Sequence, residues 1–248
     1  MTSFLYRAPS GVAGDVTRPD DTVVEPGLLN AAQAPTAFGA PVKLVSGKFE
    51  KIAASDTATV FAGILSRIAP SIAGDTAQTF AGGTPNTDSV QGIVVEGYVN
   101  VVCTIGTPVR GGTVYMRVVE APGKAVGDLE ATSDVGADGA AGAGNAGNGT
   151  IGTVSATQAA QSGVYIVTMT GATTFQVVAP DGTQLKAGAT GAAYTADGVT
   201  FTITVGSVAL AAGDKFTVTV TKNNVALTGV VWAVDGKDAS NVTEIRIA

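Results

Sequence analysis

The sequence has no histidine and a single cysteine among its 248 residues. These absences exclude histidine-based catalytic triads, Cys–His pairs and most zinc sites, because each needs an imidazole or several thiolates. Cys103 cannot form an internal disulfide, and its apolar strand pattern favours a buried small hydrophobe over a reactive thiol. We therefore expect no catalytic residue, no metal ligand, no cofactor and no enzymatic activity.

Charge is also scarce, since only 14% of the residues are charged, against about 25% in an average soluble domain. The net charge is -6, and the few lysines and arginines are scattered. Nucleic-acid binding requires clustered cations that neutralise phosphates, so we expect no nucleic-acid partner. An uncharged surface suits a protein covered by partners, and it equally suits a β protein rich in small residues.

Long apolar runs are missing although the mean hydropathy is +0.32. The longest candidate, 92–106, is interrupted by Glu96 and Asn100, and no run approaches the roughly 18 apolar residues of a membrane helix. The first ten residues lack a basic segment followed by an apolar one. We therefore expect no membrane partner and no secretion signal.

What the sequence does contain is many short β-branched runs separated by glycine and proline, in 41–130, 150–222 and 223–248. Such runs predict an all-β fold, a sandwich or a barrel. Helical periodicity is absent, and 30–33 forms at most one turn. In 199–205, apolar side chains alternate with threonines, which predicts a strand with one buried face.

Composition changes along the chain predict its organisation. Residues 1–40 contain four prolines and predict an extended N-terminal arm, which either wraps its own core or reaches a neighbouring subunit by strand addition. The Gly/Ala-rich stretch 134–149 predicts a flexible linker or exposed loop. We expect 41–133 and 223–248 to form one β-barrel core, with 150–222 inserted as a small β-sandwich.

Candidate contact residues are the apolar side chains of the arm and the single tryptophan. Trp232 lies in a β-branched run and is predicted in the core, with an interface anchor as the alternative. The candidate interface residues are Phe4, Leu5, Tyr6, Leu28, Leu29 and Trp232.

Several segments within 1–130 and 223–248 form a recognisable pattern of strands and turns. They are Phe-Gly-Ala-Pro-Val at 38–42, the segments 91–99 and 108–115, and an ending with Trp232, Gly236 and Glu244-Ile245. This pattern resembles the structural cement proteins of tailed phages and prophages. A second group of segments lies in the middle of the chain, at 149–150, 163–165, 175–177, 180–182, 201–203 and 212–216. It resembles a small β module of phage head-decoration proteins, which is typically inserted or appended.

The resemblance implies a jelly-roll-like β-barrel and a virion protein on the capsid exterior. Its implied partners are the major capsid protein, whose subunit contacts it stabilises, and further copies of itself in a dimer or trimer. Residues 150–222 are expected either to contact neighbouring copies or to bind a host surface or glycan weakly.

The alternative is a surface or tail adhesin that binds a host carbohydrate or receptor. That function favours exposed aromatics, and only 6% of the residues are aromatic. A glycosidase using two carboxylates is a third alternative.

Overall fold

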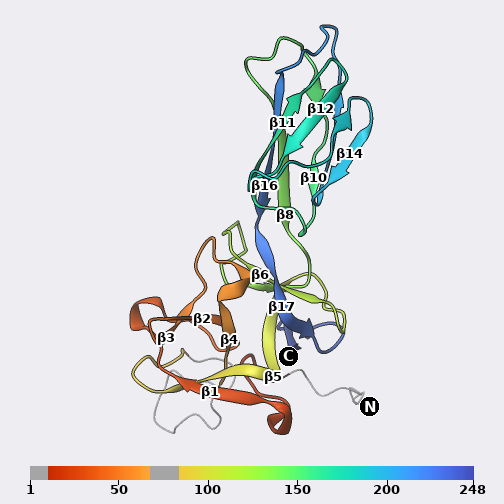
Figure 1. Cartoon of the computed structure of the whole chain (residues 1–248). Helices are drawn as coiled ribbons and strands as arrows, with labels where there is room; N and C mark the ends of the chain where they lie inside the picture. The colour runs from red at the N-terminus through yellow and green to blue at the C-terminus, as the bar shows by residue number, and fades with distance from the viewer. Residues whose placement is uncertain (1–10, 68–83) are drawn as a thin grey trace, which may run out of the picture. The chain divides into compact units, whose positions relative to one another are not determined.

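The computed structural model describes residues 11–67 and 84–248, and this part of the chain is almost entirely β-structure (Figure 1). The helical segments in it are three-residue 3-10 turns, namely η1 (Pro19–Asp21), η2 (Ala31–Gln33) and η3 (Ala58–Val60). The predicted all-β class is confirmed, as is the single turn expected near 30–33. No helix in the described residues is long and apolar enough to cross a membrane.

The chain forms two compact units. Unit 1 consists of Met1–Thr132 and Asn224–Ala248, and unit 2 of Ser133–Asn223. The chain therefore leaves unit 1 once and returns to it once, and each unit has its own hydrophobic core.

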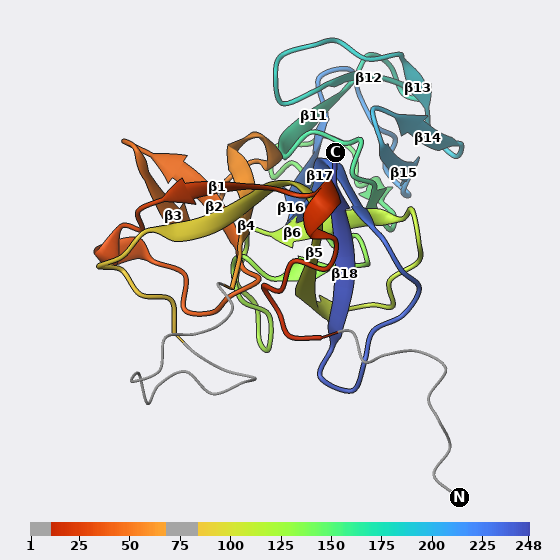
Figure 2. The ribbon, with the colours of Figure 1, turned by 90° about the horizontal axis from the view of Figure 1, so that it is seen from below.

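Unit 1 begins with a small ring of strands. In order around the ring these are β1 (Val23–Gly27), β5 (Gln91–Ile105), β4 (Phe61–Leu65), β2 (Pro41–Val45) and β3 (Lys48–Lys51). Figure 2 shows β1 alongside β5. The ring closes directly after β1, where the Phe49 N–H donates to the Leu28 carbonyl and the Asn30 N–H donates to the Phe49 carbonyl. Its interior is filled by Leu29, Val42, Phe49, Leu65 and Ile93.

A second ring uses the other half of β5. Its further strands are β18 (Val242–Ile247), β17 (Asn224–Trp232), β6 (Thr113–Arg117) and β7 (Leu129–Glu130). β5 pairs with β18 through residues 97–102 and with β7 at Cys103 and Ile105, which closes this ring. The interior includes Val99, Val101, Cys103, Val114, Met116, Leu129, Trp232 and Ile245.

Gly97 lies at the point where β5 passes from the first ring to the second. Its φ is +105°, and a Cβ there would lie 2.3 Å from the carbonyl oxygen of Asp21 and 2.4 Å from Oγ1 of Thr22. Glycine is required because other residues disfavour this backbone conformation and would clash with the backbone of Asp21. One strand can therefore supply both rings.

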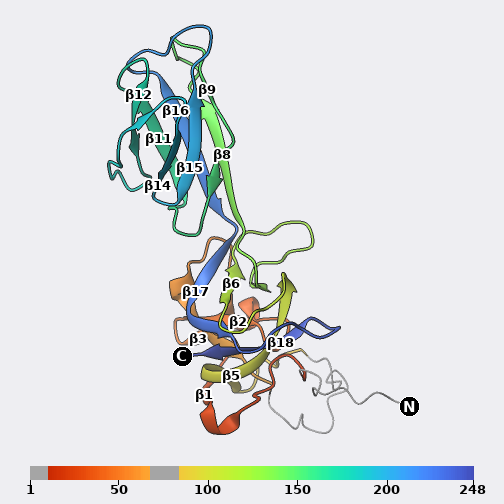
Figure 3. The same ribbon diagram turned by 90° about the vertical axis from the view of Figure 1, so that its right-hand side faces the viewer.

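Unit 2 is a sandwich of two antiparallel sheets (Figure 3). One sheet contains β13 (Gly188–Ala189), β12 (Thr174–Val178), β11 (Gly163–Met169), β16 (Lys215–Lys222) and β8 (Val135–Ala141). The other contains β10 (Ser155–Ala156), β15 (Val199–Thr204), β14 (Ala193–Ala196) and β9 (Thr150–Ile151). The core between them includes Phe175, Tyr194 and Phe201, whose ring centroids lie 4.9 to 5.9 Å apart.

The linker prediction for 134–149 was wrong. Residues 135–141 form β8, which pairs with β16 along its whole length. The rest of the stretch is held as well, because Oδ1 of Asn145 accepts a hydrogen bond from the Lys215 N–H at 2.7 Å. Glycine and alanine bury little surface, but the backbone of β16 supplies the hydrogen bonds that order them.

The N-terminal segment, from residue 11 onwards, is part of the fold of unit 1. β1 forms one side of the first ring, and Val16 makes a β-bridge with Val99. Of the two alternatives for the arm, the contacts of 11–40 within this chain correspond to wrapping its own core.

Candidate functional site

The predicted contact residues fall into different environments. Phe4, Leu5 and Tyr6 lie outside the described residues. Leu28 is 45% exposed, whereas Leu29 is 2% exposed and lies in the core of the first ring. Successive side chains of an extended segment point in opposite directions, so only Leu28 can face a partner. The prediction of Leu29 as a contact residue was wrong.

Trp232 belongs to the core of the second ring. It is 1% exposed, packs in the same cluster as Ile245, and donates from its indole Nε1 to the carbonyl oxygen of Thr113 at 3.0 Å. A buried and hydrogen-bonded indole offers almost no surface to a partner. The core interpretation of Trp232 is therefore confirmed, while its role at an interface stays a prediction.

Leu28 is part of a larger set of exposed aliphatic side chains on the first ring. We call this set the exposed aliphatic surface, and it consists of Val23, Val24, Leu28, Leu44 and Val45. Their exposed fractions run from 39% to 57%, although large aliphatic side chains are normally buried. Exposed aliphatic side chains on the first ring offer apolar area that a partner can bury. The sequence analysis identified only Leu28 of this set.

The strands of the first ring hold these side chains in place. Leu28 and Leu44 both adjoin Phe49, because the Phe49 N–H donates to the Leu28 carbonyl and Leu44 is its cross-strand partner in β2. Val45 precedes the turn at Ser46 and Gly47, which both have positive φ. A ring of paired strands keeps this surface preorganised, so little conformational entropy is lost when a partner binds.

A hollow of about 230 Å³ lies elsewhere in unit 1. It is lined by 35–41, 125–129 and short parts of β3 and β5, with mostly small or apolar residues. Asp128 is one of its charged residues, and its carboxylate accepts from the Ala125 N–H of its own loop at 2.9 Å. The hollow offers shape and apolar area to a side chain of a partner.

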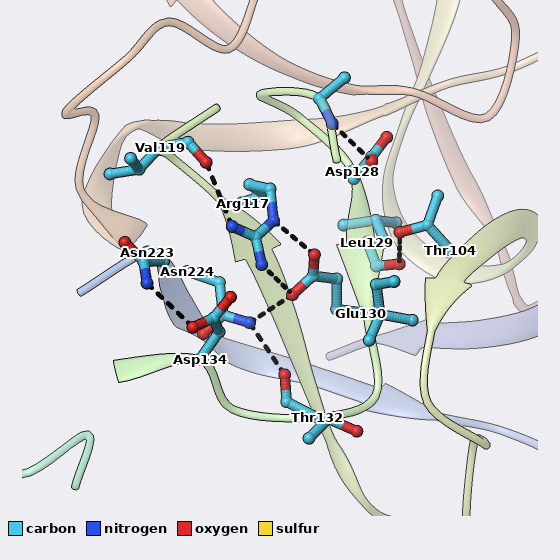
Figure 4. Close-up of polar contacts among 12 residues, drawn as sticks. Thr104, Arg117, Val119, Asp128, Leu129, Glu130, Thr132, Asp134, Asn223 and Asn224 are labelled. Carbon is cyan, nitrogen blue, oxygen red and sulfur yellow. Dashed lines mark hydrogen bonds and ion pairs between the residues drawn. The ribbon is translucent and has the colours of Figure 1, made fainter. Parts of the chain in front are cut away.

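The most extensive polar cluster is buried in the second ring (Figure 4). Nε and Nη2 of Arg117 donate to the two carboxylate oxygens of Glu130 at 2.5 and 3.1 Å. Nη1 of Arg117 also donates to the Val119 carbonyl, at 3.2 Å. Nδ2 of Asn224 donates to Glu130 at 2.6 Å and to the carbonyl oxygen of Thr132 at 2.8 Å.

This cluster holds together the two segments at which the chain leaves unit 1 and returns to it. The side chains of Arg117 and Glu130 are 0% exposed, so they cannot meet a ligand from solvent. Asn224 is the first residue after the return and is tied to Thr132, the last before the exit. Sequence reasoning missed the cluster because its members are far apart in the chain and carry no local motif.

Unit 2 has a matching connection between its own ends. The Asn223 N–H donates to the Asp134 carbonyl at 3.0 Å, and Nδ2 of Asn223 donates to the Asp134 carboxylate at 2.9 Å (Figure 4). Both units therefore close their ends with asparagine hydrogen bonds.

Burial raises the pKa of three groups, Cys103, Tyr165 and Tyr194. Burial raises the pKa of the Cys103 thiol, which keeps it protonated and a poor nucleophile. Burial, together with the hydrogen bond to Asp197, raises the pKa of Tyr165 to about 12. Within residues 11–67 and 84–248, no group of three or more histidine, cysteine, aspartate or glutamate side chains could hold a metal ion.

Comparison with solved structures finds only weak structural similarity, with low TM-scores. Two crystal structures of FlgL from Xanthomonas campestris have TM-scores of 0.30, with 25% and 20% identity over 46% and 75% of this chain. The chain spans 39% and 45% of those proteins. A chain from the capsid of Myoviridae Phage XM1 has a TM-score of 0.38 and 19% identity, covering 53% of this chain and 79% of that one. Scores this low support no argument about function.

Comparison with protein families gives a clear assignment. No curated protein matches the chain. The family described as XM1 gp53 minor capsid protein matches residues 1–146, which is more than half of the sequence. The matched region contains the whole exposed aliphatic surface. The chain belongs to the XM1 gp53 minor capsid protein family and is a capsid-associated structural protein of a bacteriophage.

Proposed function

We propose that this protein is a cement or decoration protein, which binds the outer surface of the assembled capsid and stabilises contacts between major capsid protein subunits. Family membership supports a structural role in the capsid. The observation that carries the finer proposal is the exposed aliphatic surface on the first ring.

The exposed aliphatic surface suits contact with a folded neighbour. Burying one leucine or valine side chain contributes about 1.5–3 kcal/mol. Stable protein contacts bury roughly 1,200–2,000 Å² in total, so these side chains would contribute only part of a wider interface. The hollow beside 35–41 would accept a side chain from the same or an adjacent subunit.

The stabilising mechanism is mass action. A protein that binds the assembled lattice better than free subunits shifts the equilibrium towards the lattice. Two or more linked contacts raise the effective concentration of each, so no single contact has to be strong. A dimer or trimer of this chain would supply such linked contacts around a symmetry axis of the lattice.

The charge of the chain supports an exterior location. The net charge of -6 and the isoelectric point near 4.6 oppose a position against packaged DNA, whose phosphates repel an acidic protein. We therefore place the protein outside the capsid, with the major capsid protein as its partner.

The adhesin alternative is less well supported. Sugar binding commonly uses exposed aromatic rings, but every aromatic residue of unit 2 is buried. These residues are Tyr165, Phe175, Tyr194, Phe201 and Phe216.

The test is a binding experiment with purified protein, expanded empty capsids and dispersed capsid subunits. We expect saturable, stoichiometric co-sedimentation with expanded capsids and little binding to subunits. The variant Leu44→Glu places a charge on the exposed aliphatic surface and should weaken capsid binding about 10- to 100-fold. Val205→Glu is the control, because Val205 is similarly exposed but lies in unit 2.

Two outcomes would overturn the proposal. One is the absence of wild-type binding to expanded capsids. The other is wild-type affinity in the Leu44→Glu variant, which would leave the exposed aliphatic surface without a role in the contact. Saturable binding of unit 2 to a glycan array would favour the adhesin.

A further inference from the structure

A small pocket of unit 1, separate from the exposed aliphatic surface, is lined by three arginines. Its volume is about 130 Å³, and its residues come from β5, β17, β18, the segment before β1 and the turn before β6. The charged side chains around it are Arg18, Arg110 and Arg246. The chain has only 14 lysines and arginines and a net charge of -6, so this grouping is exceptional.

Arg18 is held in place by two contacts. Its guanidinium lies over the ring of Tyr98, with Cζ 3.8 Å from the ring centroid. Nη2 of Arg18 also donates to the Glu244 carboxylate at 3.0 Å, and the hydroxyl of Thr17 donates to the same carboxylate. A stacked and paired guanidinium has few alternative rotamers, so its remaining N–H groups have a defined direction.

Arg246 and Arg110 are fixed through their backbones. Arg246 lies in β18 and is the cross-strand partner of Tyr98 in β5. Next to Arg110, the Gly111 N–H donates to the Trp232 carbonyl at 2.8 Å, and the Arg110 N–H donates to Asp235 at 2.8 Å. Both arginine side chains are exposed, and neither forms an ion pair with any residue that the structure describes.

The charges around this pocket do not balance. Three guanidinium groups line the pocket. Among the described residues, only that of Arg18 pairs with a carboxylate, that of Glu244, while the Asp235 carboxylate accepts from the backbone N–H of Arg110. We propose that the pocket binds the carboxylate of an aspartate or glutamate side chain presented by a capsid subunit. The identity of this partner rests on the proposed function, but the affinity of the pocket for a carboxylate does not.

The pocket fits a carboxylate for geometric reasons. Guanidinium groups bind carboxylates through paired, charge-assisted hydrogen bonds, which are stronger than neutral ones. A volume of about 130 Å³ accommodates one acidic side chain. A nucleic acid would need a continuous basic strip to follow its phosphates, and the scattered lysines of this chain do not supply one.

The direct test is NMR of the full chain titrated with a blocked peptide that contains two glutamates. The matching glutamine peptide and inorganic phosphate are the comparison ligands. We expect the glutamate peptide to shift the Nε–H signals of Arg110 and Arg246, and the effect to weaken with added salt. The double variant Arg110→Gln and Arg246→Gln should bind the glutamate peptide about fivefold more weakly.

The matched control removes the same charge elsewhere. Lys186→Gln combined with Lys215→Gln changes two exposed cations of unit 2, and this variant should keep wild-type affinity. Equal loss in both double variants would overturn the proposal, since the effect would then follow net charge. Binding of phosphate without binding of the glutamate peptide would also overturn it.

Capsid sedimentation separates this proposal from the proposed function. If wild-type protein binds expanded capsids and the arginine double variant binds them equally well, the pocket has no role in the capsid contact and the proposal fails. If the glutamate peptide binds the pocket while wild-type protein does not bind capsids, the carboxylate site stands and the cement function fails.

Discussion

Replacing Glu130 by glutamine tests how far unit 1 depends on its buried ion pair. Glutamine has nearly the same shape but no charge, so the Arg117 guanidinium would lose its counter-charge in a site where both side chains are 0% exposed. Removing one member of a buried pair costs about 3–5 kcal/mol, because the other charge stays out of water. The variant therefore removes a large part of the stability of a typical domain.

The single tryptophan gives an assay that is specific for unit 1. Trp232 is buried in the second ring, and unit 2 has no tryptophan. Urea unfolding followed by tryptophan fluorescence therefore reports unit 1 alone, while far-UV circular dichroism reports both units. With an m-value near 2 kcal/mol/M, the loss should lower the fluorescence midpoint by about 1.5–2.5 M.

Two controls accompany this measurement. Glu25→Gln removes an exposed carboxylate from β1 and should change stability by less than about 0.5 kcal/mol. Replacing Arg117 and Glu130 together by methionine should restore much of the stability, because no buried charge is then left alone. An unchanged fluorescence midpoint in Glu130→Gln would refute the reasoning, as would a double variant no more stable than the single one.

Two further changes probe the other features of the fold. Gly97→Ala should destabilise unit 1 by about 2–4 kcal/mol, because of the clash and the positive φ. Gly111→Ala should cost less, because the space around its Cβ is open. Equal losses of unfolding free energy in the two variants, measured by tryptophan fluorescence, would contradict the clash. The pKa of Asp214 is lowered by the N–H groups of Ala211 and Ala146, so its stabilising effect is present above the ordinary aspartate pKa and is lost as pH falls below it. Asp214→Asn should therefore speed amide hydrogen exchange of these N–H groups at pH 7, and exchange like that of wild type would contradict this role.

Strands can be predicted from the sequence where apolar and polar side chains alternate. In 199–205, Val199, Phe201 and Ile203 are buried as the alternation predicts. Val205 is 48% exposed because β15 ends at Thr204, and a strand end depends on its partners. Local pattern therefore predicts the element and its buried face, but not its boundary.

Features that depend on distant partners could not be predicted in this way. β8 has a Gly/Ala-rich sequence typical of a linker, and it is a strand because β16 pairs with it. Leu28 and Leu29 look alike in sequence, and the ring closure decides that one is exposed and the other buried. The Arg117 cluster joins residues 13 and 94 positions from Glu130, so no short motif could indicate it.

The closed ends of the two units have a practical consequence for engineering. Asp134 and Asn223 are hydrogen-bonded neighbours within one unit, and Thr132 and Asn224 are hydrogen-bonded neighbours within the other. The two points where the chain passes between the units therefore lie close together in each unit. A foreign domain whose first and last residues lie equally close together can be inserted between these points while the pairing of β17 with β6 is kept. The insertion point thus offers a natural attachment site for a second domain.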